Sequence, residues 1–254
     1  MAIINMTPDS FSGDGFGLRV EDAVRQTIRA VEEGADIIDV GGESTRPGHE
    51  RVSVSEEIYR VEQVIRAISA TVSVPISIDT SKASVAFAAI AAGASIVNDV
   101  RGLTGDPEMA AVVAQAGVPG VVVHDAVPDT TIDLVLSIQR ELERRIDLAL
   151  RAGIRQDKII VDPGFGFGKD WRQNLELLRR LPELKQLGFP LLIGFSRKST
   201  IGRVLALPVE ERLEGTLATT ALAITGGADI VRVHDVQANV RVARMSDAVV
   251  RVSV

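Results

Sequence analysis

Polar side chains that could do chemistry recur where short apolar runs end. Eight such ends can be identified along the chain, and the residues there are Asn5, Asp39 with Glu43, Asp79, Asn98, His124, Asp162, Ser196 to Lys198, and Arg232 with His234. Charges beside a core cost free energy unless they are paired or hydrated. Each position has its own structural explanation, because Asp79 could cap a helix and Asp162 could cap a turn. Eight polar ends together favour a functional site.

Four of these residues suit a flat heterocycle with both donors and acceptors, namely Asp79, Asn98, Asp162 and Lys198. A carboxylate can accept two parallel N–H bonds from an amino-pyrimidinone edge, while an amide and an ammonium serve the ring acceptors. A buried salt-bridge network, or a lysine that forms a Schiff base, would use the same residue types. Spacing does not separate these alternatives.

A second group suits an anion. Arg232 and His234 are two residues apart, so they share one face of the last expected strand. Asn5 ends the first strand, and Ser44-Thr45-Arg46-Pro47-Gly48 follows the second. This set predicts a site for a phosphate-bearing substrate. Asn5 with Asp9 would alternatively hold a divalent cation through oxygen ligands.

The glycine-rich stretch Gly164–Lys169 resembles a phosphate-binding loop but does not match one. The spacing differs from GxxxxGK[ST], and Asp170 stands where Ser or Thr is required. We interpret it as a loop after a strand, whose Phe167 could flank a pocket.

Short apolar runs alternate with amphipathic stretches along the whole chain. Runs that are apolar throughout are typical of parallel strands buried on both faces. The expected strands are Ala2–Met6, Ile37–Val40, Pro75–Ile78, Ser95–Val97, Gly120–Val123, Lys158–Val161, Pro190–Gly194 and Asp229–Val233. The expected helices are Val20–Glu33, Ser55–Ala70, Lys82–Ala92, Asp106–Ala116, Thr131–Ala152, Arg172–Lys185, Val209–Thr225 and Gln237–Val249.

Eight strand–helix units in 254 residues give about 32 residues per unit, which fits one βα unit. This predicts an α/β fold with a single (β/α)8 TIM barrel over residues 1–254, whose site lies at the carboxyl ends of the strands. A doubly wound open sheet is the alternative. It would usually carry a glycine fingerprint after its first strand, and Asn5-Met6-Thr7-Pro8-Asp9 contains no glycine.

Composition excludes several classes of protein. The chain has no cysteine, so disulfides, thiolate zinc sites and cysteine nucleophiles are excluded. The formal net charge of −6 gives no basic footprint for nucleic acid. No apolar run reaches membrane-spanning length and no signal peptide precedes the first strand, so we expect a cytoplasmic protein without a membrane partner.

In combination, the motifs resemble the dihydropteroate synthase family of pterin-binding TIM barrels. The resemblance rests on Asn5-Met6-Thr7-Pro8-Asp9-Ser10-Phe11-Ser12, Asp39-Val40-Gly41-Gly42-Glu43-Ser44-Thr45-Arg46-Pro47-Gly48, Ile78-Asp79-Thr80, Asn98-Asp99-Val100, Asp162-Pro163-Gly164, Ser196-Arg197-Lys198-Ser199 and Arg232-Val233-His234-Asp235. It implies an enzyme that joins 6-hydroxymethyl-7,8-dihydropterin diphosphate to 4-aminobenzoate in folate synthesis and releases diphosphate.

The resemblance also implies roles for individual residues. The pterin pocket would be formed by Asp79, Asn98, Asp162 and Lys198. The diphosphate site would be formed by Asn5, Thr45, Arg46, Arg232 and His234, with Mg2+ held near Asn5. The 4-aminobenzoate pocket would be formed by Phe11, Pro47, Phe167 and Ser199. Lys198, Asp162, Arg232 and His234 would be the catalytic residues. The implied mechanism is dissociative: diphosphate leaves, Asp162 helps to stabilise the pterin cation, and the arylamine attacks it. A homodimer with small-molecule substrates is expected.

The chain departs from the family pattern at three places. Gly13 and Asp14 are exchanged relative to the usual order, the fifth strand ends in Val123-His124-Asp125-Ala126 instead of Met-His-Met, and Thr200 replaces a frequent Phe. The altered first and fifth loops leave open a catalytically silent pterin-binding paralogue as one alternative. A second alternative is a methyltetrahydrofolate-binding methyltransferase of the same superfamily, which would share the pterin pocket. The second would not need the Arg46, Arg232 and His234 anion site.

Overall fold

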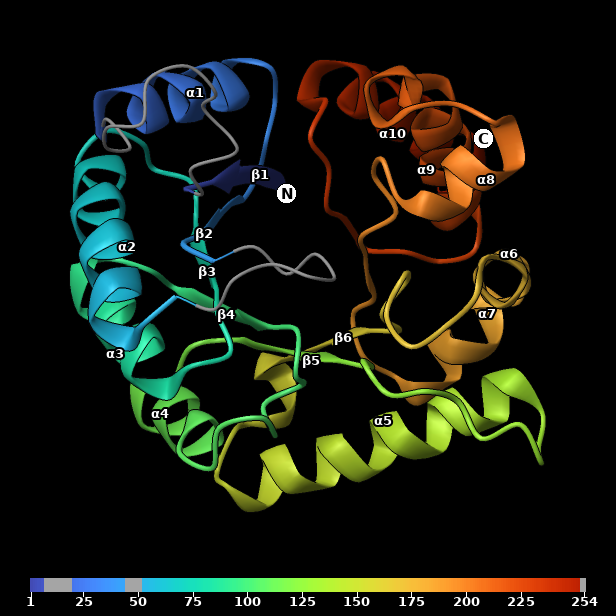
Figure 1. Ribbon diagram of the computed structural model, residues 1–254, viewed down its shortest axis with the longest axis horizontal. Helices are drawn as coiled ribbons and strands as arrows, with labels where there is room; N and C mark the ends of the chain where they lie inside the picture. Colours follow the sequence, from blue (N-terminus) through green and yellow to red (C-terminus); the bar gives the residue numbers. More distant parts are fainter. Residues whose placement is uncertain (7–19, 44–51, 252–254) are drawn as a thin grey trace.

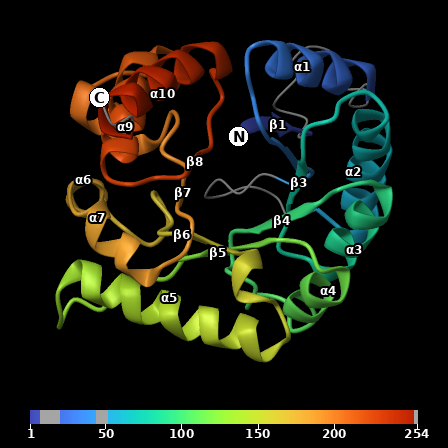
Figure 2. The same cartoon turned by 180° about the vertical axis from the view of Figure 1, so that it is seen from behind.

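In the computed structural model, which describes residues 1–6, 20–43 and 52–251, helices encircle a ring of strands (Figure 1; Figure 2 from behind). The strands are β1 (Ala2–Asn5), β2 (Ile38–Gly41), β3 (Ile76–Asp79), β4 (Ile96–Asp99), β5 (Gly120–Val123), β6 (Ile159–Asp162), β7 (Leu192–Ile193) and β8 (Ile230–Val231). The helices are α1 (Val20–Glu32), α2 (Val54–Ser69), α3 (Ala83–Ala92), α4 (Met109–Ala116), α5 (Leu134–Arg151), α6 (Trp171–Arg179), α7 (Leu181–Leu184), α8 (Ser199–Leu205), α9 (Leu213–Thr225) and α10 (Val236–Val250).

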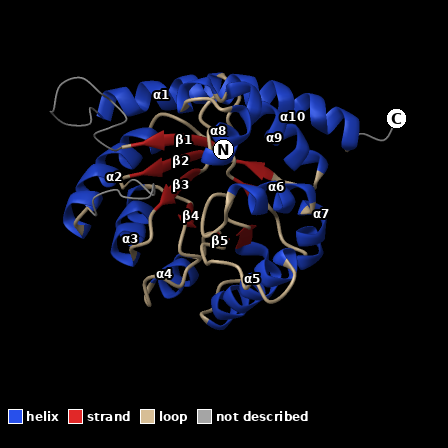
Figure 3. Cartoon of the chain, turned by 45° about the vertical axis from the view of Figure 1, so that its right-hand side comes forward, coloured by secondary structure: helices blue, strands red, loops and turns tan. Residues whose placement is uncertain are grey.

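All the strand pairs are parallel. Strands β1 to β6 pair in chain order as one sheet, and β7 pairs with β8 as a second. Two isolated bridges join the sheets, Val161 with Leu191 on one side and Ala2 with Val233 on the other. These bridges close the ring, which Figure 3 shows from the side within its layer of helices. The predicted (β/α)8 barrel is therefore confirmed.

Side chains of the strands alternate between the barrel interior and the helix layer. Ile96, Val121, Ile160 and Leu192 belong to an inner apolar cluster with Met1 and Val123. Their neighbours in the sequence, such as Val97, Val122 and Val161, pack in the larger cluster beneath the helices. On three strands, the residue two positions beyond an inward apolar residue is polar and shares its face; these are Asn98 after Ile96, Asp162 after Ile160, and Arg232 after Ile230.

The helices bury one face against the barrel. In α2, Val61, Ile65 and Ile68 are buried at three- and four-residue spacing, as expected for an amphipathic helix. The hydroxyl of Ser53 accepts a hydrogen bond from the backbone N–H of Glu56 and caps this helix. No helix in the described ranges is both long and apolar enough to cross a membrane.

Most predicted elements are confirmed within a few residues, but three differ. The expected helix Arg172–Lys185 is divided into α6, α7 and a short 3-10 turn, because Pro182 lacks an N–H and cannot continue the ladder of α6. The expected helix Val209–Thr225 begins as a 3-10 turn at 209–211, and α9 follows it. Helix α8 was not predicted.

Candidate active site at the barrel mouth

Buried polar residues converge inside the ring at the carboxyl ends of the strands. Asp39, Asp79, Asn98 and Asp162 are all buried, and they come from β2, β3, β4 and β6. Arg232, just after β8, lies among them with a partly buried side chain. The two-residue alternation of each strand explains why these positions face one another. We refer to Asp39, Asp79, Asn98 and Arg232 as the mouth cluster.

Arg232 connects the mouth cluster. Its Nε donates to Asp39 Oδ2 at 2.6 Å, and its Nη2 donates to Asp79 Oδ2 at 2.6 Å. Asn98 Nδ2 also donates to Asp39 Oδ2, at 3.2 Å. Arg232, predicted for the diphosphate site, thus contacts a carboxylate predicted for the pterin pocket. A buried salt-bridge network is therefore present, but its cation is Arg232 and not Lys198, which we had considered for that role.

Burial and charge shift the titration of this cluster. Burial raises the pKa of Asp79 to about 7, although the neighbouring Arg232 acts to lower it. Burial alone would lower the pKa of Arg232, but Asp39 and Asp79 raise it above the usual value. The guanidinium therefore stays charged, while Asp79 can change its protonation state near neutral pH.

The mouth cluster contains unused acceptors. Within the described part of the chain, Asp39 Oδ1 and Asp79 Oδ1 are buried and accept no hydrogen bond. Buried polar atoms normally have partners, so each of these oxygens is a candidate contact for a ligand or water. Asp79 also lines a cavity of about 700 Å³, together with Thr80, Lys82, Arg101 and Phe167. Asp79 therefore carries an unused acceptor and also borders the cavity.

Asp162 and Lys198 lie on the other side of the mouth. Asp162 Oδ1 accepts a hydrogen bond from the backbone N–H of Gly164 at 2.7 Å. Burial raises the pKa of Asp162, whereas that N–H and the positive charge of Lys198 lower it. Burial, and then Arg232, lower the pKa of Lys198 to about 8. An acid and an amine with such shifted pKa values are typical of functional sites.

The glycine-rich loop after β6 brings an aromatic ring to Lys198. Lys198 Nζ lies 4.5 Å from the centroid of the Phe167 ring, which is cation–π distance. The loop requires glycine at Gly164, where φ is 71° and a Cβ would lie 1.8 Å from the carbonyl oxygen of His124. Phe167 lines the cavity, as we predicted for this loop.

The remaining predicted residues are less tightly grouped. His234 Nδ1 lies 3.0 Å from the hydroxyl of Ser196, so the histidine contacts the segment that follows β7. Ser199 is exposed at the first position of α8. Four predicted residues lie outside the described residues; these are Phe11, Thr45, Arg46 and Pro47.

The described residues offer a divalent cation limited ligands. They contain no group of three His, Asp or Glu side chains placed to hold a metal ion. Two side-chain oxygens lie close to Gly41. A Cβ atom added at Gly41 would be 3.7 Å from the amide oxygen of Asn5 and 3.8 Å from Asp79 Oδ2. Oxygen ligands of this kind suit Mg2+, which commonly completes its coordination with water and substrate phosphates. Asn5 therefore fits as one ligand, provided that a phosphate supplies others.

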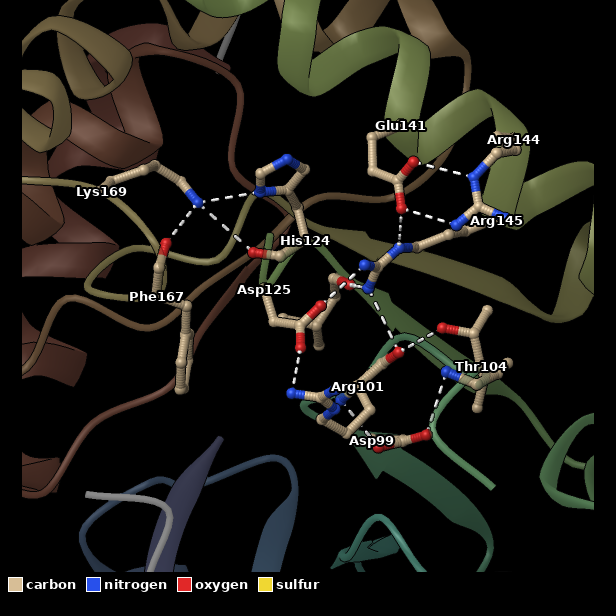
Figure 4. Close-up of polar contacts among 12 residues, drawn as sticks. Asp99, Arg101, Thr104, His124, Asp125, Glu141, Arg144, Arg145, Phe167 and Lys169 are labelled. Atoms are coloured by element: carbon tan, nitrogen blue, oxygen red, sulfur yellow. Dashed lines mark hydrogen bonds and ion pairs between the residues drawn. The ribbon is translucent and has the colours of Figure 1, made fainter. Parts of the chain in front are cut away.

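A second polar network lies just after β5, against α5 and the glycine-rich loop, and its Asp125 lines the cavity (Figure 4). Lys169 Nζ lies 2.9 Å from His124 Nδ1 and donates to the carbonyl oxygen of Phe167 at 2.8 Å. Arg145 donates to Asp125 at 2.7 Å and to the carbonyl oxygen of Val123 at 2.6 Å. We refer to His124, Asp125, Arg145 and Lys169 as the outer cluster.

Sequence reasoning gave no role to Asp39 or to Lys169. Asp39 was noted as a polar strand end, and its alternation with inward Ile37 is the signal that could have placed it in the mouth. Lys169 was dismissed with the unmatched phosphate-loop motif. Its position in a glycine-rich loop gave no indication that its ammonium points to His124.

Known proteins resemble this chain over nearly its full length. Residues 1–234 match the family described as "Pterin binding enzyme". A dihydropteroate synthase of Clostridium beijerinckii is 50% identical over 252 residues, which cover 99% of this chain and 94% of that protein.

Solved structures agree in fold. A dihydropteroate synthase from Clostridium difficile, crystallised in the presence of pteroic acid, has a TM-score of 0.96 and 48% identity, and the match covers 99% of this chain and 96% of that one. The enzyme of Xanthomonas albilineans with 4-aminobenzoic acid has a TM-score of 0.94 and 44% identity, covering 99% and 93% of the two chains. Similarity of this extent reaches beyond the fold to the family.

Proposed function

This chain belongs to the dihydropteroate synthase family of pterin-binding enzymes, and we propose on that premise how its residues carry out the reaction. The enzyme is a transferase that joins 6-hydroxymethyl-7,8-dihydropterin diphosphate to 4-aminobenzoate, giving 7,8-dihydropteroate and diphosphate. This condensation is a step of folate biosynthesis. The comparisons favour it over the methyltransferase alternative.

The observation that carries the residue assignment is the unused Oδ1 of Asp79, which is buried in a residue that lines the cavity. We assign Asp79, Asn98, Asp162 and Lys198 to the pterin. Asp79 would accept N–H bonds from the amino-pyrimidinone edge, and Lys198 would donate to a ring acceptor. Arg232 favours the ionised form of the Asp79 carboxyl, although burial raises the pKa of that carboxyl to about 7, and it orients the group for this contact.

Departure of diphosphate leaves positive charge on the CH2 carbon and the pterin ring. A buried carboxylate at Asp162 would stabilise that charge, since the surrounding burial strengthens the interaction. Within the described residues, Nη1 of Arg232 makes no hydrogen bond, so it can bind an anion while Nε and Nη2 hold the two carboxylates. We assign Arg232, His234 and Asn5 to the leaving diphosphate, with Thr45 and Arg46 from the segment outside the described residues.

We also propose Mg2+ as the metal, with Asn5 as its protein ligand. When bound, it would neutralise charge on the diphosphate. The aromatic amine would lie beside Phe167 and Ser199, and Phe11 and Pro47 complete this pocket in the proposal. Attack by its nitrogen on the CH2 carbon needs no protein nucleophile, which agrees with a chain that has no cysteine.

The direct test is release of diphosphate from the two substrates and Mg2+, with and without a chelator. Release that depends on both substrates and falls with the chelator is expected. Binding of the pterin diphosphate in a calorimeter without any release would instead establish the silent paralogue. Release that the chelator leaves unchanged would remove the metal from the proposal.

We further propose a homodimer formed through α9 and α10, in a single-domain cytoplasmic enzyme. Leu222 on α9, and Met245 and Val249 on α10, expose 57%, 67% and 69% of their surface. Helices α9 and α10 pack against each other, and large exposed apolar side chains on such neighbouring helices favour a protein interface. Light scattering after size-exclusion chromatography should give twice the 27.1 kDa chain mass, and a Met245→Glu variant should shift towards the monomer.

A further inference from the structure

Lys169 is one of two buried cationic side chains in the outer cluster, with Arg145, and it takes no part in the reaction as proposed above. Its Nζ lies within hydrogen-bond distance of three acceptors, at 2.9 Å from His124 Nδ1, 2.8 Å from the Phe167 carbonyl oxygen and 3.3 Å from the His124 carbonyl oxygen (Figure 4). Burial lowers the pKa of Lys169 to about 7. In the protonated form its ammonium has three donors, and these three contacts use all of them. His124 Nδ1 then acts as the acceptor, and its proton is on Nε2.

The histidine is suited to this acceptor role. Burial, together with the charges of Lys169 and Arg145, lowers the pKa of His124 to about 3. The ring is therefore neutral at physiological pH and keeps a lone pair for Lys169. His124 follows β5 directly, so the contact connects the glycine-rich loop to the barrel wall.

Phe167 is the residue through which this contact reaches the site. Figure 4 shows its carbonyl turned towards Lys169 and its ring pointing away. The ring lies 4.5 Å from Lys198 Nζ and lines the cavity. Lys169, in contrast, is not among the described residues that line the cavity. A residue that touches the main chain of a site residue, without facing the site, acts by positioning.

We propose that Lys169, seated on His124, is a positioning residue that holds the Phe167 ring beside Lys198 and so shapes the subsite for the aromatic amine. This inference rests on the proposed function, because the amine is the second substrate of that reaction. Asn174 assists on the other side of the loop, where its Oδ1 accepts from the N–H of Gly166 at 2.9 Å.

The kinetic test compares Lys169→Met with the wild type in the diphosphate-release assay, varying one substrate at a time. Losing the charged donor frees two buried carbonyls and the imidazole, so the loop should lose its fixed position. We expect KM for 4-aminobenzoate to rise roughly tenfold, as for the loss of one hydrogen bond, while KM for the pterin diphosphate stays nearly unchanged. Lys158→Met, at the opposite end of β6, is the matched control and should behave as the wild type.

A second readout does not depend on activity. Trp171 is the single tryptophan of the chain and the first residue of α6, two positions beyond Lys169. Acrylamide should quench its fluorescence more strongly in Lys169→Met than in Lys158→Met. If Lys169→Met does not fold, His124→Phe removes the ring acceptor and leaves both carbonyls, and it should give the same two changes at smaller size.

The outcomes separate the two proposals. A wild type without diphosphate release overturns the proposed function, and the quenching measurement then decides by itself whether Lys169 holds the loop. An active wild type whose variants raise both KM values equally, or neither, overturns the positioning role. Unchanged quenching in both Lys169→Met and His124→Phe overturns it as well.

Discussion

The mouth cluster and the outer cluster use similar residues in opposite ways. In the mouth cluster, Asp39 and Asp79 each keep one buried oxygen without a donor. In the described residues of the outer cluster, no buried side-chain atom lacks a partner, and Lys169 is bonded on three sides. A buried polar network that is fully satisfied stabilises one conformation, whereas an unsatisfied one is ready to bind. The difference separates ligand binding from support.

The largest effect should follow from Arg232→Met, which breaks the mouth cluster. It leaves two buried carboxylates without their cation, and loss of one partner of a buried ion pair typically costs roughly 3 kcal/mol of unfolding free energy. Urea denaturation measures this loss, and diphosphate release should fall with it. Arg155→Met removes an exposed ion pair with Asp157 and serves as the control, which should unfold like the wild type.

Asp162→Asn should weaken pterin binding with little change in folding. Removing one charged hydrogen bond to the ligand costs about 1.5–3 kcal/mol of binding free energy, which calorimetry with a pterin ligand would detect. The backbone N–H of Gly164 keeps an acceptor in this variant, so the loop should stay in place. Equal affinity in the two proteins would move the pterin away from Asp162.

The raised pKa of Asp79 predicts how stability depends on pH. The folded protein holds a proton on this carboxyl up to about pH 7, whereas an unfolded aspartate releases it near its ordinary pKa of 3.8. The folded state therefore binds more protons between these values, and the free energy of unfolding should fall as pH rises through this window. Asp79→Asn should flatten that decline. Urea midpoints measured at intervals between pH 4 and pH 8 would contradict the assignment if both proteins gave the same slope.

The smallest effect should come from Asp170→Ala, beside the outer cluster. Asp170 Oδ1 accepts a hydrogen bond from the backbone N–H of Gln173. The side-chain oxygen of Gln173 in turn accepts a hydrogen bond from the backbone N–H of Asp170, which completes a capping box. Loss of such a cap typically costs about 1 kcal/mol. Thermal unfolding should show this decrease while both KM values remain unchanged. A large rise in either KM would mean that α6 itself, and not Lys169, positions the loop.

The barrel fold and the inward positions of Asn98 and Asp162 could be predicted from the sequence, because both follow from local periodicity. Alternation along a strand carries Asn98 and Asp162 inward, and the eight units require a closed ring. The pairing of Arg232 with Asp39 was not predictable, since these residues are 193 positions apart and meet across the closure of the ring. Nor does any local pattern show that Lys169 lies against His124, because their contact depends on how the loop folds over the end of β5.

Few backbone contacts close the barrel, and this affects how easily the barrel opens. Strands β7 and β8 are two residues long, and single bridges connect them to the larger sheet. Arg232 lies just beyond β8 and binds carboxylates of β2 and β3, so its ion pairs fasten one side of this seam to the other. A pterin held by Asp79 at the end of β3 and by Lys198, which follows β7, would connect the long sheet to the segment after the short one. Bound substrate would then stabilise the barrel against local opening between the two sheets. In the enzyme without substrate, local opening would have its lowest free-energy cost at this junction.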